Sequence, residues 1–221
     1  MIDFLIIDDS SEESILASFK NIANEIMNQH LLCIGATYYR IVECEFYYSS
    51  AAHEDPFVHG HALQKSTIGK WYFHGSGLDI TLGNGKGYGG ILIRGIAEVN
   101  EQLPMPDRAS TVIGPLNVCN KIFNTIGSVM LQPNVAFGFV HKNEISSKLN
   151  LPTATVFAVT RIGLNHERDA LGQFHSKPYR FITFLHLQHK EAEKVKNYLI
   201  NKAPKPITKE AYKAYQSGEK Y

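Results

Sequence analysis

The chain has few of the residues that mark a secreted or membrane protein. It contains three cysteines in 221 residues, and no two of them have the CxxC spacing. An odd number of scattered cysteines does not build a disulfide framework, so we expect reduced thiols and a cytoplasmic protein. No apolar run approaches the roughly 20 residues that cross a bilayer. The first residues, MIDFLIIDDSSEES, are acidic and do not resemble a signal peptide.

The chain also lacks an excess of charge of one sign, because its net charge is +1. This balance hides a split along the sequence. The first 60 residues hold ten Asp or Glu against two Lys or Arg, which leaves eleven against twenty for the rest. The basic part suits a polyanionic partner, but the total charge alone does not predict nucleic-acid binding.

The arrangement of apolar residues along the chain predicts one α+β domain. Apolar residues at helical spacing predict a first helix over residues 10–27 and a late one over 190–201. Alternating stretches with glycine turns between them predict a curved, mostly antiparallel and partly barrel-like sheet with flanking helices. Further strands are expected near 153–160 and 179–187, and a short helix over 143–149. We expect a single domain over residues 1–203 and a basic, partly ordered tail over 204–221.

The strand over residues 38–48 carries two glutamates on one face. Since side chains alternate along a strand, Glu43, Glu45 and Tyr47 share a face, and Val42, Cys44 and Phe46 share the other. Glu is depleted in strands, so the pair needs a reason. Either this face is solvated, or a carboxylate lines a cleft that the following loop covers.

A long polar loop over residues 49–65 follows this strand. It contains His53, His59 and His61 beside two acidic residues, and long loops in compact domains are often functional. The histidine spacing matches no established metal motif, so we predict no metal site. A metal-dependent hydrolase that uses these three histidines remains an alternative.

The glycine run GNGKGYGG over residues 83–90 formally contains the dinucleotide fingerprint GxGxxG. That fingerprint requires a helix after the glycines, whereas ILIRGIAEV follows here and predicts a strand that is apolar apart from Arg94. We therefore assign the glycines to tight turns and predict no cofactor. Arg161 and Arg180 flank a second long loop, where each could form an ion pair or contact an anion.

Several blocks of the sequence occur in an order that resembles a known family. In chain order they are RIVECEFY (40–47), EDP (54–56) with His59, ILIRG (91–95), GPLNVCN (114–120), RIG (161–163) and PYRF (178–181). Together they extend over about residues 33 to 187. In this order they resemble the methylpurine-type (alkyladenine, or 3-methyladenine) DNA glycosylases.

The resemblance implies a base-excision-repair enzyme that hydrolyses the N-glycosidic bond of an alkylated purine in double-stranded DNA. The purine would be flipped out of the duplex, and no metal or covalent lysine would be needed. Glu45 would correspond to the catalytic glutamate that activates water, and Tyr47 to the aromatic residue that stacks on the flipped base. His59 would correspond to the histidine that bonds to the base, and Arg161 to an arginine near the water and a phosphate.

Two departures from the family lie in the hairpin over residues 71–81. This hairpin is shorter than in the family, where it carries a tyrosine that wedges into the minor groove. Tyr72 and His74 are the nearest candidates for that wedge. Asp79 lies where the family has an asparagine, and its negative charge favours a cationic base. The short hairpin also favours an alternative, a non-catalytic protein that binds a nucleobase or small ligand on the same scaffold.

Overall fold

The computed structural model describes residues 3–127, 135–145 and 149–221. The α-helices of this part of the chain are α1 (Glu12–Asn28), α2 (Ala62–Ser66), α3 (Pro115–Gly127), α4 (Ala192–Asn201) and α5 (Lys209–Ser217), and the 3-10 helices are η1 (Asp3–Leu5), η2 (Lys142–Glu144) and η3 (His166–Arg168). The strands are β1 (His30–Ile34), β2 (Thr37–Ser50), β3 (His53–Glu54), β4 (Ile68–His74), β5 (Gly77–Leu82), β6 (Tyr88–Val99), β7 (Thr111–Ile113), β8 (Phe137–His141), β9 (Phe157–Val159) and β10 (Arg180–Ile182).

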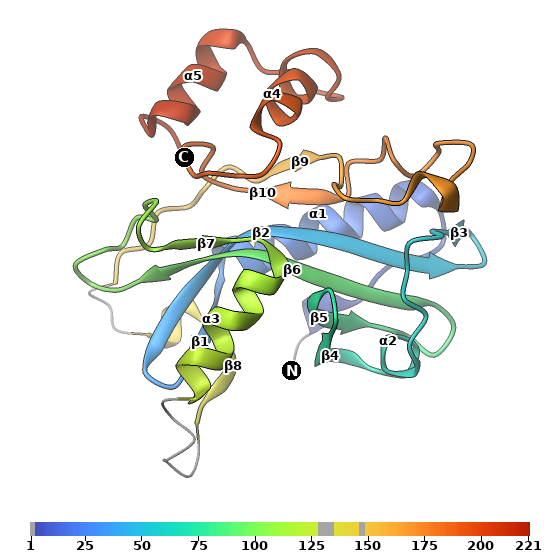
Figure 1. Cartoon of the computed structure of the whole chain (residues 1–221), viewed down its shortest axis with the longest axis horizontal. Coiled ribbons are helices and arrows are strands. Elements are labelled where there is room, and N and C mark those ends of the chain that lie inside the picture. Colours follow the sequence, from blue (N-terminus) through green and yellow to red (C-terminus); the bar gives the residue numbers. More distant parts are fainter. Residues whose placement is uncertain (1–2, 128–134, 146–148) are drawn as a thin grey trace.

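The strands form one curled antiparallel sheet with the order β4-β5-β6-β2-β1-β8, which gives the half-barrel of Figure 1. β2 organises it. One edge of β2 pairs with β6 along almost its whole length, and the other edge pairs with β1, β10 and β3 in turn. A bulge shifts the β2–β6 register near Glu43, opposite Gly95. The predicted face of Val42 is therefore wrong, because the bulge brings Ile41 into the core with Cys44 and Phe46, and Val42 packs in a separate cluster. A Cβ at Gly95 would lie 2.8 Å from Ile113 Cδ1 and 3.0 Å from Glu43 Cβ, so a larger residue would force these neighbours to shift. The expected α+β class is confirmed.

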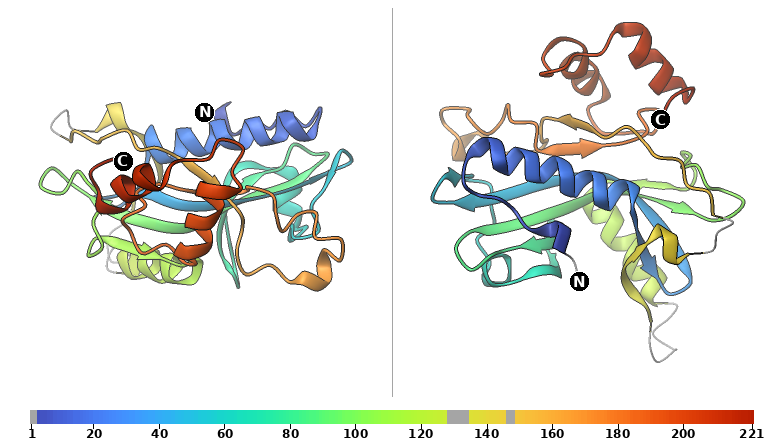
Figure 2. Two further views of the ribbon diagram at one scale, coloured as in Figure 1. Left: turned by 90° about the horizontal axis from the view of Figure 1, so that it is seen from above. Right: turned by 180° about the vertical axis from the view of Figure 1, so that it is seen from behind.

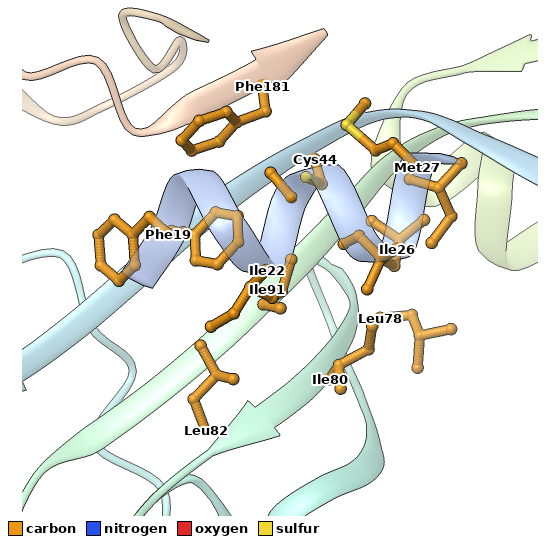
Figure 3. Packing of buried hydrophobic residues seen from close by; sticks show 14 of the residues in the cluster. Phe19, Ile22, Ile26, Met27, Cys44, Leu78, Ile80, Leu82, Ile91 and Phe181 are labelled. Carbon is orange, nitrogen blue, oxygen red and sulfur yellow. The ribbon is translucent and has the colours of Figure 1, made fainter. Parts of the chain in front are cut away.

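Helix α1 covers the apolar face of the sheet. Its N-terminus is capped by Ser11, whose side chain accepts a hydrogen bond from Ser14 N–H. From behind, the helix lies across the central strands (Figure 2). Phe19, Ile22 and Ile26 pack against apolar side chains of β2, β5 and β6 (Figure 3). This burial fixes which face of β2 points into the core.

The opposite face of β2 is polar but not solvated. Glu43 and Glu45 are both 0% exposed, so the solvated-face interpretation is wrong. The chain after β9 covers them, since Ile162 N donates to Glu45, and β10 pairs with β2 alongside. The structure therefore favours the other interpretation, in which a carboxylate lies beside a cleft. The segment that covers the two glutamates is the chain after β9, which lies far from β2 in sequence.

The C-terminal segment 204–221 contains helix α5. Tyr212 is 3% exposed and belongs to a second apolar cluster with residues of β9, β10 and α4. Thr208 caps the helix and Gly218 ends it with φ +81°. The tail therefore includes an ordered helix that packs on α4, at the end of the molecule away from α3 (Figure 1).

Other expected elements are shorter than the sequence pattern suggested. In place of the short helix over 143–149 the structure has η2, and residues 146–148 lie outside the described part. The strands expected near 153–160 and 179–187 are the three-residue β9 and β10. None of the helices in the described residues combines the length and the apolar character of a membrane span.

Candidate functional site

A pocket of about 510 Å³ opens over the polar face of the sheet. Its wall includes Tyr47 from β2, Arg94 from β6 and Asp79 from β5. Side chains on paired strands project to the same face, and Asp79 pairs with Leu92, which in turn pairs with Glu45. The loop after β3, the loop after β9 and the start of α4 complete the wall. The volume is in the range of small-molecule sites.

Glu45 lies directly behind this wall, and three pocket-lining residues hold its carboxylate. Ile162 N donates to Oε1 at 3.0 Å, and the Tyr47 hydroxyl donates to Oε2 at 2.7 Å. Arg94 Nη1 donates to Oε2 at 3.2 Å. A carboxylate has about four lone-pair positions, so these three donors leave about one for a further donor such as water.

The partners of Glu45 keep the protonation states that this arrangement needs. Burial raises the pKa of Tyr47 well above its ordinary value, and the negative charge of Glu45 raises it further. Tyr47 is therefore protonated and can donate. Burial opposes the charge of Arg94, but Glu45 and Glu43 together raise the pKa of Arg94 above its ordinary value. Arg94 is thus a fixed cation at the pocket wall.

Glu43, two residues earlier, has a different environment. Arg94 Nε and Arg180 Nε donate to Oε1 at 3.1 and 3.0 Å, and His189 Nδ1 lies 2.9 Å from Oε2. Burial alone would raise the pKa of Glu43. The hydrogen bond from His189 and the charges of Arg180, His189 and Arg94 outweigh burial and lower the pKa to about 2. Glu43 is therefore an anionic centre that orients Arg94.

Arg161 is buried behind the pocket and is not one of the residues that line it. Its Nη1 and Nη2 donate to Asp55 at 2.7 and 3.1 Å, and Nη1 also donates to Phe46 O. The guanidinium lies over the Tyr47 ring, 4.6 Å from its centroid. The structure thus gives Arg161 an ion-pair role: it ties the long loop 49–65 to β2 and supports Tyr47 from behind.

Asp79 and His74 form the opposite end of the pocket. His74 Nε2 lies 3.1 Å from Asp79 Oδ1, and Gln64 Nε2 donates to Asp79 Oδ2 at 2.8 Å. Gly90 makes this pair possible, because a Cβ there would lie 2.7 Å from Asp79 Oδ2. His59 packs edge-on against His74, with ring centroids 4.4 Å apart. His59 is an exposed residue, but partial desolvation of its ring, followed by the nearby His74, lowers the pKa of His59 and favours its neutral form.

The structure brings together most of the residues that the sequence singles out. Tyr47, His59, His74 and Asp79 line one pocket, and Glu45 lies behind it. Tyr72 does not line it but stacks between the rings of His61 and His74.

The three histidines of the long loop are not brought together. His53 is buried against Phe174 and Tyr179, and His61 accepts a hydrogen bond from Leu63 N at the start of α2. Of the three, only His59 lines the pocket. The metal alternative based on His53, His59 and His61 therefore has no common site in the described residues.

Sequence analysis missed the roles of Arg94, Gln64 and Ile162. Arg94 did leave a signal, since it is the single charged residue in the apolar stretch ILIRGIA of β6. Gln64 left no signal in its loop. The contribution of Ile162 is a backbone N–H, which no residue type encodes. Arg168 and Lys190 also line the pocket and add positive charge.

Comparisons with known proteins give no functional assignment. No family model matches the chain. One similar protein is described as "Uncharacterized protein L759" of Acanthamoeba polyphaga mimivirus, at 26% identity over 197 residues. The match covers 75% of this chain and 86% of the relative. Its description names no activity.

Proposed function

We propose that the protein hydrolyses the N-glycosidic bond of a modified, alkylated purine in DNA, in the manner of the methylpurine-type glycosylases it resembles. The observation that carries the proposal is the Glu45 carboxylate. It is held by Tyr47, Arg94 and Ile162 N, all of which line a pocket of small-molecule size. A positioned carboxylate beside such a pocket is what a general base requires.

In the proposed reaction, Glu45 takes a proton from water through its remaining lone pair. The water oxygen bonds to the sugar carbon C1′, and the C1′–N bond breaks with its electron pair leaving on the purine. A purine alkylated at N3 or N7 is cationic, so it departs as a neutral base without a separate acid. The carboxylate also stabilises the positive charge that develops on the sugar.

Binding of the purine is assigned to the pocket residues around Glu45. The Tyr47 ring lines the pocket and is held from behind by Arg161, so it offers a fixed surface for stacking. Asp79 offers a negative charge to a cationic base. The purine would be rotated out of double-stranded DNA, and stacking and pocket hydrogen bonds would offset that cost, which is a few kcal/mol.

The test is release of purine from methylated duplex DNA by the purified chain. Glu45→Gln removes the base but keeps the size of the side chain, and we expect release to fall at least about 100-fold. Glu54→Gln is the matched control, because Glu54 is exposed in the following loop and should change nothing. Absence of release from both methylated DNA and modified nucleosides at high protein concentration would contradict the proposal.

One observation favours the second candidate, a non-catalytic protein that binds a nucleobase or small ligand on the same scaffold. Glu45 is 0% exposed and already accepts from three donors, an arrangement that also suits a purely structural carboxylate. A gel shift with duplex DNA containing an abasic analogue separates the two. A glycosylase retains this duplex, and its affinity falls steeply as salt is added.

The proposed location is the cytoplasm. Cys33, Cys44 and Cys119 are all buried as free thiols in the structure. Unpaired thiols of this kind are usual in a reducing compartment. The proposal involves no membrane partner.

A further inference from the structure

Three potential metal ligands meet at the end of the pocket opposite Glu45. His59 comes from the loop after β3, and His74 and Asp79 come from the hairpin of β4 and β5. One ligand atom from each lies within 4.8 Å of the others. The sequence does not reveal the group, because 14 and 4 residues separate its members and no one element carries all three.

Two of these ligand atoms are buried without hydrogen-bond partners in the described residues. They are His74 Nε2 and Asp79 Oδ1, which lie 3.1 Å apart but are not aligned as donor and acceptor. Buried polar atoms are nearly always satisfied, so two facing the same point require an explanation. An ion that accepts a lone pair from each atom would satisfy both.

The carboxylate is also oriented as a metal ligand usually is. Gln64 Nε2 donates to Asp79 Oδ2 at 2.8 Å, which leaves Oδ1 directed at the histidines. Gly90 provides the space for this contact, since a Cβ would meet both Asp79 Oδ2 at 2.7 Å and Gln64 Nε2 at 3.0 Å. Outer hydrogen bonds that fix a ligating carboxylate are a regular feature of metal centres.

We propose that His59, His74 and Asp79 bind a divalent transition-metal ion of the zinc class, with a further coordination position open to the pocket. Two imidazoles and one carboxylate form a common zinc ligand set, and nitrogen ligands disfavour Mg²⁺ and Ca²⁺. Ligand atoms about 2.1 Å from a tetrahedral ion lie roughly 3.4 Å apart. His59 can close the remaining gap, because it is exposed and precedes Gly60 at φ +67°.

Binding requires one local rearrangement at His74. Its Nδ1 accepts a 3.3 Å hydrogen bond from Ser76 N, which places the proton of the neutral ring on Nε2. A metal at Nε2 displaces that proton, and the neutral ring then carries its proton on Nδ1. The Ser76 N–H then loses its acceptor on His74 and must donate to water instead. Water can reach it because Ser76 lies in an exposed turn. Metal binding therefore releases a proton or shifts it within the ring.

The proposed ion is separate from the Glu45 centre. Asp79 and Glu45 lie two strand spacings apart, on the order of 10 Å, with Leu92 between them. The inference goes beyond the proposed hydrolysis, and the two meet only at Asp79. With the ion bound, the carboxylate of Asp79 is neutralised and no longer attracts a cationic base. A metal at this position would bind an electron-rich group of whatever molecule enters the pocket.

The experiment is a titration of the full chain with Zn²⁺, after treatment with a chelator, against a chromophoric competitor. We expect one ion per chain. His59→Ala and Asp79→Asn should each raise Kd at least about 100-fold, because outer partners alone account for 10- to 100-fold. His59 is exposed, so its variant is expected to fold. His166→Ala changes a histidine outside the group and should leave Kd unchanged.

Binding of clearly less than one Zn²⁺ per chain would overturn the proposal. It would also be overturned if Kd were the same in wild type, His59→Ala and Asp79→Asn. Glu45→Gln distinguishes the two proposals, because it should bind Zn²⁺ as wild type does while losing hydrolysis. Zinc binding without hydrolysis would leave this inference standing and remove the glycosylase. Hydrolysis without zinc binding would support the glycosylase and overturn the metal site.

Discussion

Glu43 and Glu45 are two residues apart on the same strand face, but their surroundings give them different capacities. Glu43 contacts Arg94, Arg180 and His189, so its carboxylate is surrounded by cationic or donor groups from three elements. Glu45 contacts one guanidinium, one hydroxyl and one backbone N–H at the pocket wall. Of the two, Glu45 is therefore the one whose partners line the pocket, and Glu43 stabilises the charges around it.

This difference predicts a pH dependence of stability that belongs to Glu43. Its pKa is about 2 in the fold against an ordinary 4.5. A lowered pKa stabilises the fold above pH 4.5, and this contribution is lost as the pH falls from 4.5 to 2. The shift corresponds to roughly 3 kcal/mol. Glu43→Gln should lose this stabilisation at pH 7 and show a flatter dependence on pH in that interval.

The measurement is the free energy of unfolding in urea for both proteins at several pH values between 7 and 2.5. Other carboxylates titrate in the same range, so the useful quantity is the difference between variant and wild type. That difference should narrow by roughly 3 kcal/mol as the pH falls. If it stays constant with pH, the buried network does not hold Glu43 ionised.

At the scale of single elements, β2 shows how far the sequence could predict the site. After the bulge, the alternation of Glu43, Glu45 and Tyr47 with Cys44 and Phe46 identified the two faces of the strand correctly, because periodicity records which side chains point the same way. Before the bulge the assignment was wrong: Ile41 packs in the core with Cys44 and Phe46, and Val42 packs in a separate cluster. It could not identify what covers the polar face. That cover comes from residues more than 100 positions later, and no local pattern encodes such a contact.

The partners of Arg161 and Arg94 could not be predicted from the sequence for the same reason. Sequence analysis could place Arg161 beside the site by resemblance, but its pairing with Asp55 depends on how two long loops meet. Arg94 was visible as the charge in an apolar strand, but its two carboxylate partners depend on the register of β2 and β6. Residue type and spacing identified the two arginines as candidate site residues. Their contacts follow only from the strand register and the loop packing of the folded chain.

The Asp55–Arg161 pair should be a strong link between the loop 49–65 and the rest of the fold. Both side chains are 0% exposed, so Asp55→Ala leaves an unpaired buried guanidinium and should cost about 3–5 kcal/mol. Arg161→Met should cost a similar amount. The double variant should cost clearly less than the sum, because neither charge is then left alone.

Urea unfolding of the four proteins of this cycle gives the coupling free energy. Glu54→Ala changes the exposed neighbour of Asp55 and serves as control, with an expected change within about 0.5 kcal/mol. Additive single effects would show that the two side chains do not depend on each other, contrary to the bidentate contact.

At the scale of the whole molecule, the described residues form a sheet with one large apolar core and two smaller clusters, of which one lies at the C-terminal edge and the other contains Val42 and Phe184. The first cluster joins α1, α3 and the central strands, and the second joins β9, β10, α4 and α5. The sequence predicted the first well because its helices and strands are long and regular. The second was harder to anticipate because β9 and β10 are three residues each and α5 has a polar, lysine-rich sequence.

The C-terminal cluster nevertheless supports the site, because β10 provides Arg180 next to Glu43, and the segment before α4 provides Lys190 at the pocket. Helix α5 should therefore contribute to the stability of the whole chain. Tyr212 is 3% exposed within this cluster. Tyr212→Ala should cost about 3 kcal/mol, as removal of a buried aromatic ring typically does. Gln216→Ala, at an exposed position of the same helix, should cost less than about 0.5 kcal/mol. Thermal and urea unfolding of both variants measure these changes in the free energy of unfolding. If the Tyr212→Ala protein is as stable as Gln216→Ala, the tail packs too weakly to hold α4 in place.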